Sequence, residues 1–166
     1  MTGQRSRPRL EPGQEWVWDY PRPPALEPVA QRVQVVFAGE LIADTVRGYR
    51  VLETAHPPTF YLPPDDVRMD LLEPDDLRTF CEWKGQAVYW TLRLGERRAE
   101  AAAWSYPDPT PAFAAIRDHL AFYPSRVDAC YVNAEPVSAQ VGDYYGGWIT
   151  ANVVGFFKGP AGTGGW

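Results

Sequence analysis

The two lysines are the residues of this chain whose type and setting point most directly to chemistry. Of the 16 basic residues, 14 are arginines and only Lys84 and Lys158 are lysines. Each lysine stands between an aromatic residue and a glycine, at 83–85 (Trp-Lys-Gly) and 157–159 (Phe-Lys-Gly). A lysine ammonium is a compact point charge that binds a carboxylate or a phosphate where a planar guanidinium does not fit. We therefore expect the lysines to serve a site, and chance under an arginine-rich codon usage is the alternative.

A carboxylate and a thiol accompany Lys84 as candidates for catalysis. Glu53 ends an apolar run, so it could face a cavity and pair with Lys84 or act as a general base, with a surface salt bridge as the alternative. Cys81 lies three residues before Lys84, so a strand would point the two side chains to opposite faces and a turn would bring them together. A nearby ammonium would favour the reactive thiolate, and a buried packing cysteine is the alternative. These three residues do not make a complete catalytic set.

We expect neither a metal nor a cofactor. No two of the possible zinc ligands have the short spacing that structural zinc sites use. The acidic residues between positions 65 and 76 lack the glycine and the ligand spacing of a calcium loop, and they predict a solvated loop. No phosphate-binding glycine loop, nucleophile elbow or HExxH string occurs. The four possible zinc ligands are His56, Cys81, His119 and Cys130.

Aromatic residues are numerous enough to form the walls of a pocket. They make up 14% of the chain and include seven tryptophans, more than a small core needs. Several lie near Lys84 in the sequence or in the hairpin that follows it, among them Tyr89 and Trp90. Such rings can hold a flat or cationic small molecule, although core packing is the alternative for each one. The predicted ligand-binding residues are Glu53, Tyr61, Trp83, Lys84, Trp104 and Tyr106.

Short alternating apolar runs predict that β-strands position these residues. The strongest hairpin joins residues 86–94 to 97–106 through Gly95-Glu96, and we expect it inside a sheet, with apolar residues at 88, 90, 92 and 94 on one face. Hairpins are also predicted at 33–43 and at 127–137, where the second turns at Asn133-Ala134. Further short strands are expected at 49–52, 59–62 and 67–71. The fold class is therefore mainly β.

One short helix is predicted at 111–120. Thr110 can cap it, Pro111 suits its first position, and Phe113, Ile116 and Leu120 fall on one stripe. We expect this helix to cover one side of a sheet.

The chain is expected to form one β domain at 16–166, preceded by a flexible arm at 1–15. The proline-rich start and the glycine-rich end both contain tryptophans, and we expect Trp18 and Trp148 to pack on the domain, because exposed tryptophans in loose tails are costly. A Trp-x-Tyr-Pro-x-Pro motif occurs at 18–23 and again at 104–109. This repetition suggests a degenerate internal duplication, with chance as the alternative.

Several motifs together resemble the family called domain of unknown function 427, which is also filed under a nucleotidyltransferase-type label. The resemblance runs from about Trp16 to the end of the chain, with Glu82 standing where a proline is usual. It implies a β-tent-like fold of two antiparallel sheets, shared with zinc-binding domains that use CxxC pairs, which this chain lacks, and with methionine sulfoxide reductases of the B type and the ligand-binding domain of cereblon. The motifs lie at 51–58, 61–67, 81–85, 103–107 and 121–124.

Charge and cysteine content restrict the partners and the compartment. The formal net charge is −5 and no run of basic residues occurs, so we expect no nucleic acid partner. No apolar segment is long enough for a membrane span, and no export signal precedes the domain. Only two cysteines occur, far apart in sequence, which fits free thiols in the cytoplasm. A homo-oligomer remains possible.

These observations favour a domain that binds a small flat or aromatic molecule, fixed by Lys84 and Glu53. An enzyme of unassigned reaction that uses the same pocket, in acid-base or covalent work on a nucleotide or an aromatic metabolite, is the first alternative. A protein-interaction module is the second.

Overall fold

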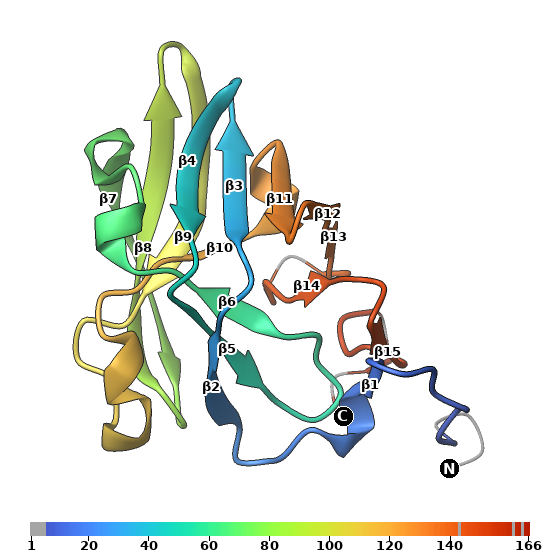
Figure 1. Cartoon of the computed structure of the whole chain (residues 1–166). Coiled ribbons are helices and arrows are strands. Elements are labelled where there is room, and N and C mark those ends of the chain that lie inside the picture. Colours follow the sequence, from blue (N-terminus) through green and yellow to red (C-terminus); the bar gives the residue numbers. More distant parts are fainter. Residues whose placement is uncertain (1–5, 143, 161, 164) are drawn as a thin grey trace.

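Short strands dominate the structure, as the alternating apolar residues predict. The computed structural model describes residues 6–142, 144–160, 162, 163, 165 and 166. Two four-stranded antiparallel sheets form the framework of these residues, and smaller sheets extend it (Figure 1). The predicted fold class, mainly β with antiparallel sheets, is confirmed.

The first four-stranded sheet contains the predicted central hairpin. Its order is β10-β9-β8-β7, and the β8–β9 hairpin turns at Gly95. Leu92 of β8 is fully buried in the main core, with Trp90 and Leu94 packed beside it, as predicted. The other face of β8 is also buried at Tyr89, and this face borders the site described below. The strands are β7 (Leu72–Cys81), β8 (Gly85–Leu94), β9 (Arg97–Ser105) and β10 (Ala121–Phe122).

The segment 64–81 differs from two sequence predictions. The predicted strand at 67–71 is replaced by an isolated bridge from Val67 to Ala43 and by the 3-10 turn η4 (Met69–Leu71), which follow the 3-10 turn η3 (Pro64–Asp66). The predicted acidic loop at 65–76 covers η3, η4 and the start of β7, and in the described residues β7 pairs with β8 alone, with a bulge between Asp75 and Arg78. An edge strand can carry charged residues and proline because one of its sides needs no partner, so hydrophobic alternation did not reveal it.

The second four-stranded sheet has the order β12-β11-β3-β4. Residues of β3 alternate between buried and half-buried, which gives this strand one face in the core. Asn133 and Ala134 both have positive φ at the β11–β12 turn, the conformation of a two-residue hairpin turn. Both predicted hairpins are confirmed. The strands are β3 (Val33–Phe37), β4 (Glu40–Thr45), β11 (Ala129–Val132) and β12 (Glu135–Pro136).

The predicted helix is shorter and tighter than expected. Residues Pro111–Ile116 form a 3-10 helix, η5, which is kinked at Phe113 and ends before Leu120. Phe113, Ile116 and Leu120 are buried, as predicted. The Thr110 hydroxyl does not cap the helix, because it donates to the carbonyl oxygen of Trp83 instead (2.7 Å).

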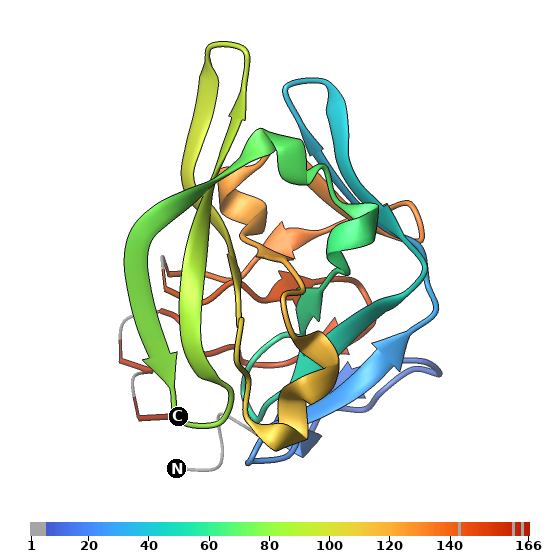
Figure 2. The same cartoon turned by 90° about the vertical axis from the view of Figure 1, so that its left-hand side faces the viewer.

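The main core lies between the two four-stranded sheets, and a second buried cluster lies beside η5. The hairpin ends of both sheets project at the same end of the molecule (Figure 2). At the other end a three-stranded sheet, β2-β5-β6, packs against the second cluster. Its strands are β2 (Ala25–Val29), β5 (Gly48–Leu52) and β6 (Thr59–Tyr61).

Both terminal segments pack on this framework, as the sequence predicts. Trp148 is fully buried in the main core and donates its indole N–H to the carbonyl oxygen of Phe122 (3.0 Å). Trp16 is buried and Trp18 is half-buried. The N-terminal and C-terminal segments pair with each other through the parallel strands β1 and β15 (Figure 1). The remaining elements are β1 (Glu15–Trp16), η2 (Val17–Asp19), η6 (Pro124–Arg126), β13 (Ser138–Ala139), β14 (Trp148–Ile149) and β15 (Val153–Val154).

None of the helical segments in the described part of the chain could span a lipid bilayer.

Candidate functional site

One pocket collects the residues that the sequence predicted for ligand binding and catalysis. Its volume is about 430 Å³. Cys81, the third catalytic candidate, lines it, as does Tyr89, whereas Trp90 lies elsewhere and donates its indole N–H to Ser105. The six predicted ligand-binding residues in its wall are Glu53, Tyr61, Trp83, Lys84, Trp104 and Tyr106.

A tight turn between β7 and β8 directs Lys84 into this pocket. The Lys84 amide donates to the carbonyl oxygen of Cys81 (3.2 Å), so the chain reverses and places the two side chains on the same pocket wall. Gly85 has φ +111°, and a Cβ there would lie 3.2 Å from the Asp108 carbonyl oxygen, so glycine is required for this close approach. The Thr110 amide donates to the Lys84 carbonyl oxygen (3.1 Å), which fixes the turn against η5.

The Lys84 ammonium is buried among aromatic rings. The residue is 9% exposed, and its Nζ lies 6.0 Å from the ring centre of Tyr106 and 5.8 Å from that of Phe113. Burial lowers the pKa of Lys84, but nearby Tyr61 and Cys81, with a smaller effect of Glu53, outweigh burial and raise it. Lys84 is therefore a cation at neutral pH, and no carboxylate of the described residues lies within 4 Å of it.

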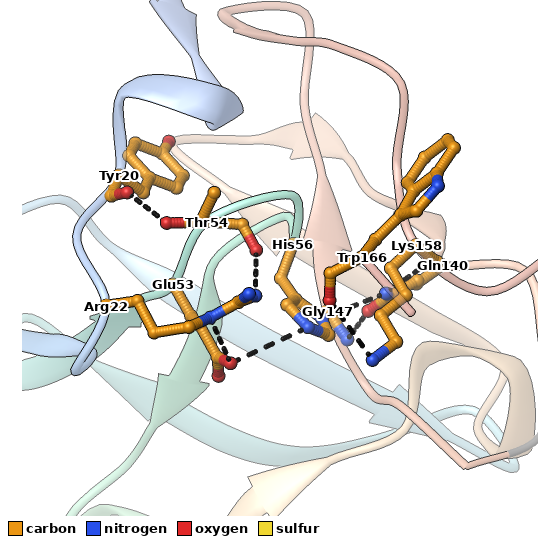
Figure 3. A network of polar contacts seen from close by, with 9 residues as sticks. All are labelled: Tyr20, Arg22, Glu53, Thr54, His56, Gln140, Gly147, Lys158 and Trp166. Atoms are coloured by element: carbon orange, nitrogen blue, oxygen red, sulfur yellow. Dashed lines mark hydrogen bonds and ion pairs between the residues drawn. The ribbon is translucent and has the colours of Figure 1, made fainter. Parts of the chain in front are cut away.

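Glu53 is bound by a partner other than the predicted one. Its Oε2 lies 3.4 Å from Nε of Arg22, and the same guanidinium donates to the Thr54 carbonyl oxygen (2.8 Å; Figure 3). Among the described residues no direct ion pair joins Glu53 to Lys84, and Glu53 forms the salt bridge that the sequence offered as the alternative, with Arg22 from the N-terminal segment. Arg22 lies far from Glu53 in the sequence, so no local pattern connects the two residues.

His56 and Gln140 connect the pocket to the C-terminal segment. The Gln140 amide accepts a hydrogen bond from the Gly147 amide (3.1 Å) and donates to the Lys158 carbonyl oxygen (2.6 Å), so its orientation is fixed (Figure 3). Its nitrogen also faces Nδ1 of His56 (3.3 Å), which makes Nδ1 the acceptor and places the proton of neutral His56 on Nε2, 3.9 Å from Glu53.

Neutral His56 is favoured by its surroundings. Burial and three nearby cations lower the pKa of His56 to about 4. Nδ1 accepts from Gln140, and Nε2 faces Glu53 at 3.9 Å, too far for a hydrogen bond, so the imidazole is poorly placed to accept a proton from a ligand. The three cations are Lys158, Arg22 and Lys84.

Lys158, the second lysine of the chain, lines the same pocket. Its amide donates to the Ala55 carbonyl oxygen (2.8 Å), and its ammonium lies 3.4 Å from the Trp166 carbonyl oxygen and 5.5 Å from the Tyr145 ring centre. Both aromatic-Lys-Gly triplets therefore end at one cavity. The sequence gives no reason to expect Lys158 beside Lys84, because the two positions differ by 74 residues.

Aromatic rings contact one another around the pocket. Trp104 is perpendicular to Tyr61 at 6.3 Å and lies 4.6 Å from Tyr123, measured between ring centres. Tyr106 lies 6.2 Å from Tyr61. Burial raises the pKa of Tyr61, Tyr106 and Tyr123, so these phenols remain neutral. Tyr123 donates its proton to the Tyr144 carbonyl oxygen (3.1 Å), and Tyr106 is hydrogen-bonded to Tyr61.

The C-terminal segment supplies the pocket residues that sequence reasoning missed. Tyr144, Tyr145 and Gly146 line the pocket, and Gly146 passes so close to Trp104 that a Cβ would lie 2.4 Å from the indole. Tyr145 also stands edge-on to His56, with ring centres 4.8 Å apart. The sequence marks these pocket residues only by a Tyr-Tyr-Gly-Gly string, which is typical of a glycine-rich tail.

The four possible zinc ligands do not converge. Cys130 lies in the main core, where burial raises its thiol pKa to about 12, and His119 contacts Tyr49. Within the residues described, no three His, Cys, Asp or Glu side chains are placed to share a metal ion. Both cysteines are free thiols, and Cys81 is the one that reaches the pocket.

Comparison with known proteins gives a family and no activity. No curated protein matches the chain. A family described as a domain of unknown function, DUF427, with a nucleotidyltransferase-type name, matches residues 25–133. This range is narrower than the resemblance from Trp16 to the end, and it leaves the C-terminal part of the pocket outside. Because it spans more than half of the 166 residues, the chain belongs to the DUF427 family.

Proposed function

We propose that this chain binds a small flat molecule in the pocket that Lys84 and Lys158 share. The supporting observation is the convergence of the only two lysines on one cavity that has tryptophan and tyrosine walls. Pockets of a few hundred cubic ångströms that are mainly aromatic, with few polar groups, are typical of small-molecule sites. Lys84 would orient the ligand. Glu53 is paired with Arg22 and faces His56, and it would affect the bound ligand through its charge. The free thiols favour a reducing compartment such as the cytoplasm.

A thermal-shift screen with flat aromatic compounds tests this proposal. We expect at least one compound to stabilise the parent protein and to leave Lys84→Met unaffected, because the ammonium that orients it is gone. Lys84→Arg should also fail to respond, since a larger planar cation does not fit a site that leaves lysine 9% exposed. The matched control is Arg98→Met, which removes an exposed cation from β9.

Two outcomes would contradict the proposal. The first is a screen in which no aromatic compound raises the melting temperature of the parent. The second is a screen in which every compound that stabilises the parent stabilises Lys84→Met as strongly.

The second candidate function is an enzyme that uses the same pocket. The observation in its favour is the turn that brings the Cys81 thiol and the Lys84 ammonium to one pocket wall. If Cys81 were a nucleophile, Cys81→Ser would keep the ligand-induced thermal shift and lose turnover of that ligand. A Cys81→Ser variant with unchanged turnover would remove this candidate.

A further inference from the structure

Resting on the proposed function, we propose that the molecule bound in this pocket is an aromatic carboxylic acid whose carboxylate is held by the Lys84 ammonium. Three features of the pocket carry this inference: its distribution of charge, the missing counter-ion of Lys84, and the kind of hydrogen-bond donors in its wall.

The enclosed part of the pocket has an excess of positive charge. Its charged lining residues are two lysines and two glutamates. Glu82 is exposed to solvent, where its charge is screened, and Glu53 is already neutralised by Arg22. The neutral state of His56 adds no charge of its own. The two ammonium groups are therefore left without an equal number of available carboxylates.

Among the described residues, the buried Lys84 ammonium has no carboxylate as its counter-ion, and its neighbours are the Cys81 thiol and aromatic side chains. A buried charge is destabilising unless it is paired, and the two nearby rings offset only part of that cost. No described carboxylate lies within 4 Å. The ammonium borders the cavity, so an anionic group bound there would complete its surroundings and would gain strength from the low dielectric constant.

The donors in the wall suit a carboxylate better than a phosphate. Phosphate sites generally combine any lysine with arginines, clustered backbone amides or a helix N-terminus. The described pocket lining contains no arginine, and the nearest helical element is a short 3-10 helix. One ammonium with one neutral phenol, such as that of Tyr61, can satisfy the two oxygens of a carboxylate. The aromatic walls then contact the ring to which the carboxylate is attached.

Pairs of probes that differ only in the acidic group test the inference. Benzoate, 2-naphthoate and indole-3-acetate are each titrated against their primary amides by calorimetry, with 2-naphthyl phosphate as a further probe. We expect at least one carboxylate to bind the parent about tenfold more tightly than its amide, since hydrogen bonds to charged groups contribute that much. In Lys84→Met this preference should disappear while the amide keeps its affinity. Arg98→Met should behave like the parent.

The outcomes separate this inference from the proposed function. Amides that bind as tightly as their acids would overturn the carboxylate and leave the aromatic pocket standing. Tighter binding of 2-naphthyl phosphate than of 2-naphthoate would assign the anion to a phosphate and would equally overturn it. If neither acids nor amides bind, the proposed function fails together with the inference.

Discussion

A buried ammonium persists in a folded protein only when something compensates its lost hydration. Among the described residues Lys84 has no carboxylate partner, whereas the pocket residue Glu53 forms an ion pair with Arg22. This difference between two adjacent pocket residues is not visible in their sequence positions. Scarcity of lysine indicated Lys84, but the partner of Glu53 is Arg22, which no local pattern connects to it.

His56 makes the stability of the fold depend on pH. Its pKa is about 4 in the folded chain and about 6.5 when unfolded, so below pH 6.5 the unfolded chain binds more protons and stability falls as pH falls. Between about pH 7 and pH 5 we expect a loss of about 2 kcal/mol in the free energy of unfolding. Urea denaturation at both values measures it.

His56→Gln should remove most of this loss, and His119→Gln, at the only other histidine, should retain it. The carboxylates with lowered pKa values protonate below this window, so they do not imitate the effect. Equal pH dependence in the parent and His56→Gln would show that His56 does not carry it.

The C-terminal segment acts as a structural element although it contains only short strands. Gln140 anchors it at the Lys158 carbonyl oxygen and at the Gly147 amide. Gly159 allows it to pack, because φ is +140° and a Cβ would lie 1.9 Å from the Val141 carbonyl oxygen. Gly159 is therefore needed for the packing that brings its neighbour Lys158 to the pocket.

We expect Gly159→Ala to lower the free energy of unfolding by about 2 kcal/mol through backbone strain and a displaced segment. Limited proteolysis should then cut the chain after residue 140 faster than in the parent. Gly165→Ala is the control, since nothing lies within 4 Å of its Cβ position. Identical cleavage of the two variants would refute the anchoring role of Gly159.

Elements with strong local signals could be predicted, and those defined by distant partners could not. Gly95 with its alternating neighbours indicated the β8–β9 hairpin, and Asn133-Ala134 indicated the β11–β12 turn. Strand β7 escaped because an edge strand needs no alternation, and its acidic residues resembled a loop. The pocket residues from 140 onward escaped because their roles depend on contacts with His56 and Trp104, far away in sequence.

The whole molecule depends on its terminal segments for the core as well as for the site. Trp148 comes from the C-terminal segment, yet it packs against Phe60 at 4.9 Å and belongs to the cluster between the two large sheets. The predicted internal duplication stays a prediction. Its two Trp-x-Tyr-Pro motifs begin differently, in the 3-10 turn η2 and in strand β9.

We expect Trp148→Ala to lower the free energy of unfolding by about 4 kcal/mol, because a fully buried indole leaves a large cavity. Trp18→Ala, at a half-buried site, should cost clearly less. Guanidinium unfolding followed by circular dichroism compares the two variants without relying on tryptophan fluorescence. Equal losses would mean that the C-terminal segment is not part of the core.

The segment that follows residue 133 has an evolutionary consequence. The match to the family ends at residue 133, yet the segment that follows contributes an ammonium, two phenols and the glycine that faces Trp104. Family members that agree throughout the shared range can therefore differ at five of the 21 residues that line the pocket in this chain. Selectivity can diversify through this appended stretch while the sheets stay the same, so an activity found for one member does not transfer to another without comparing their C-terminal residues.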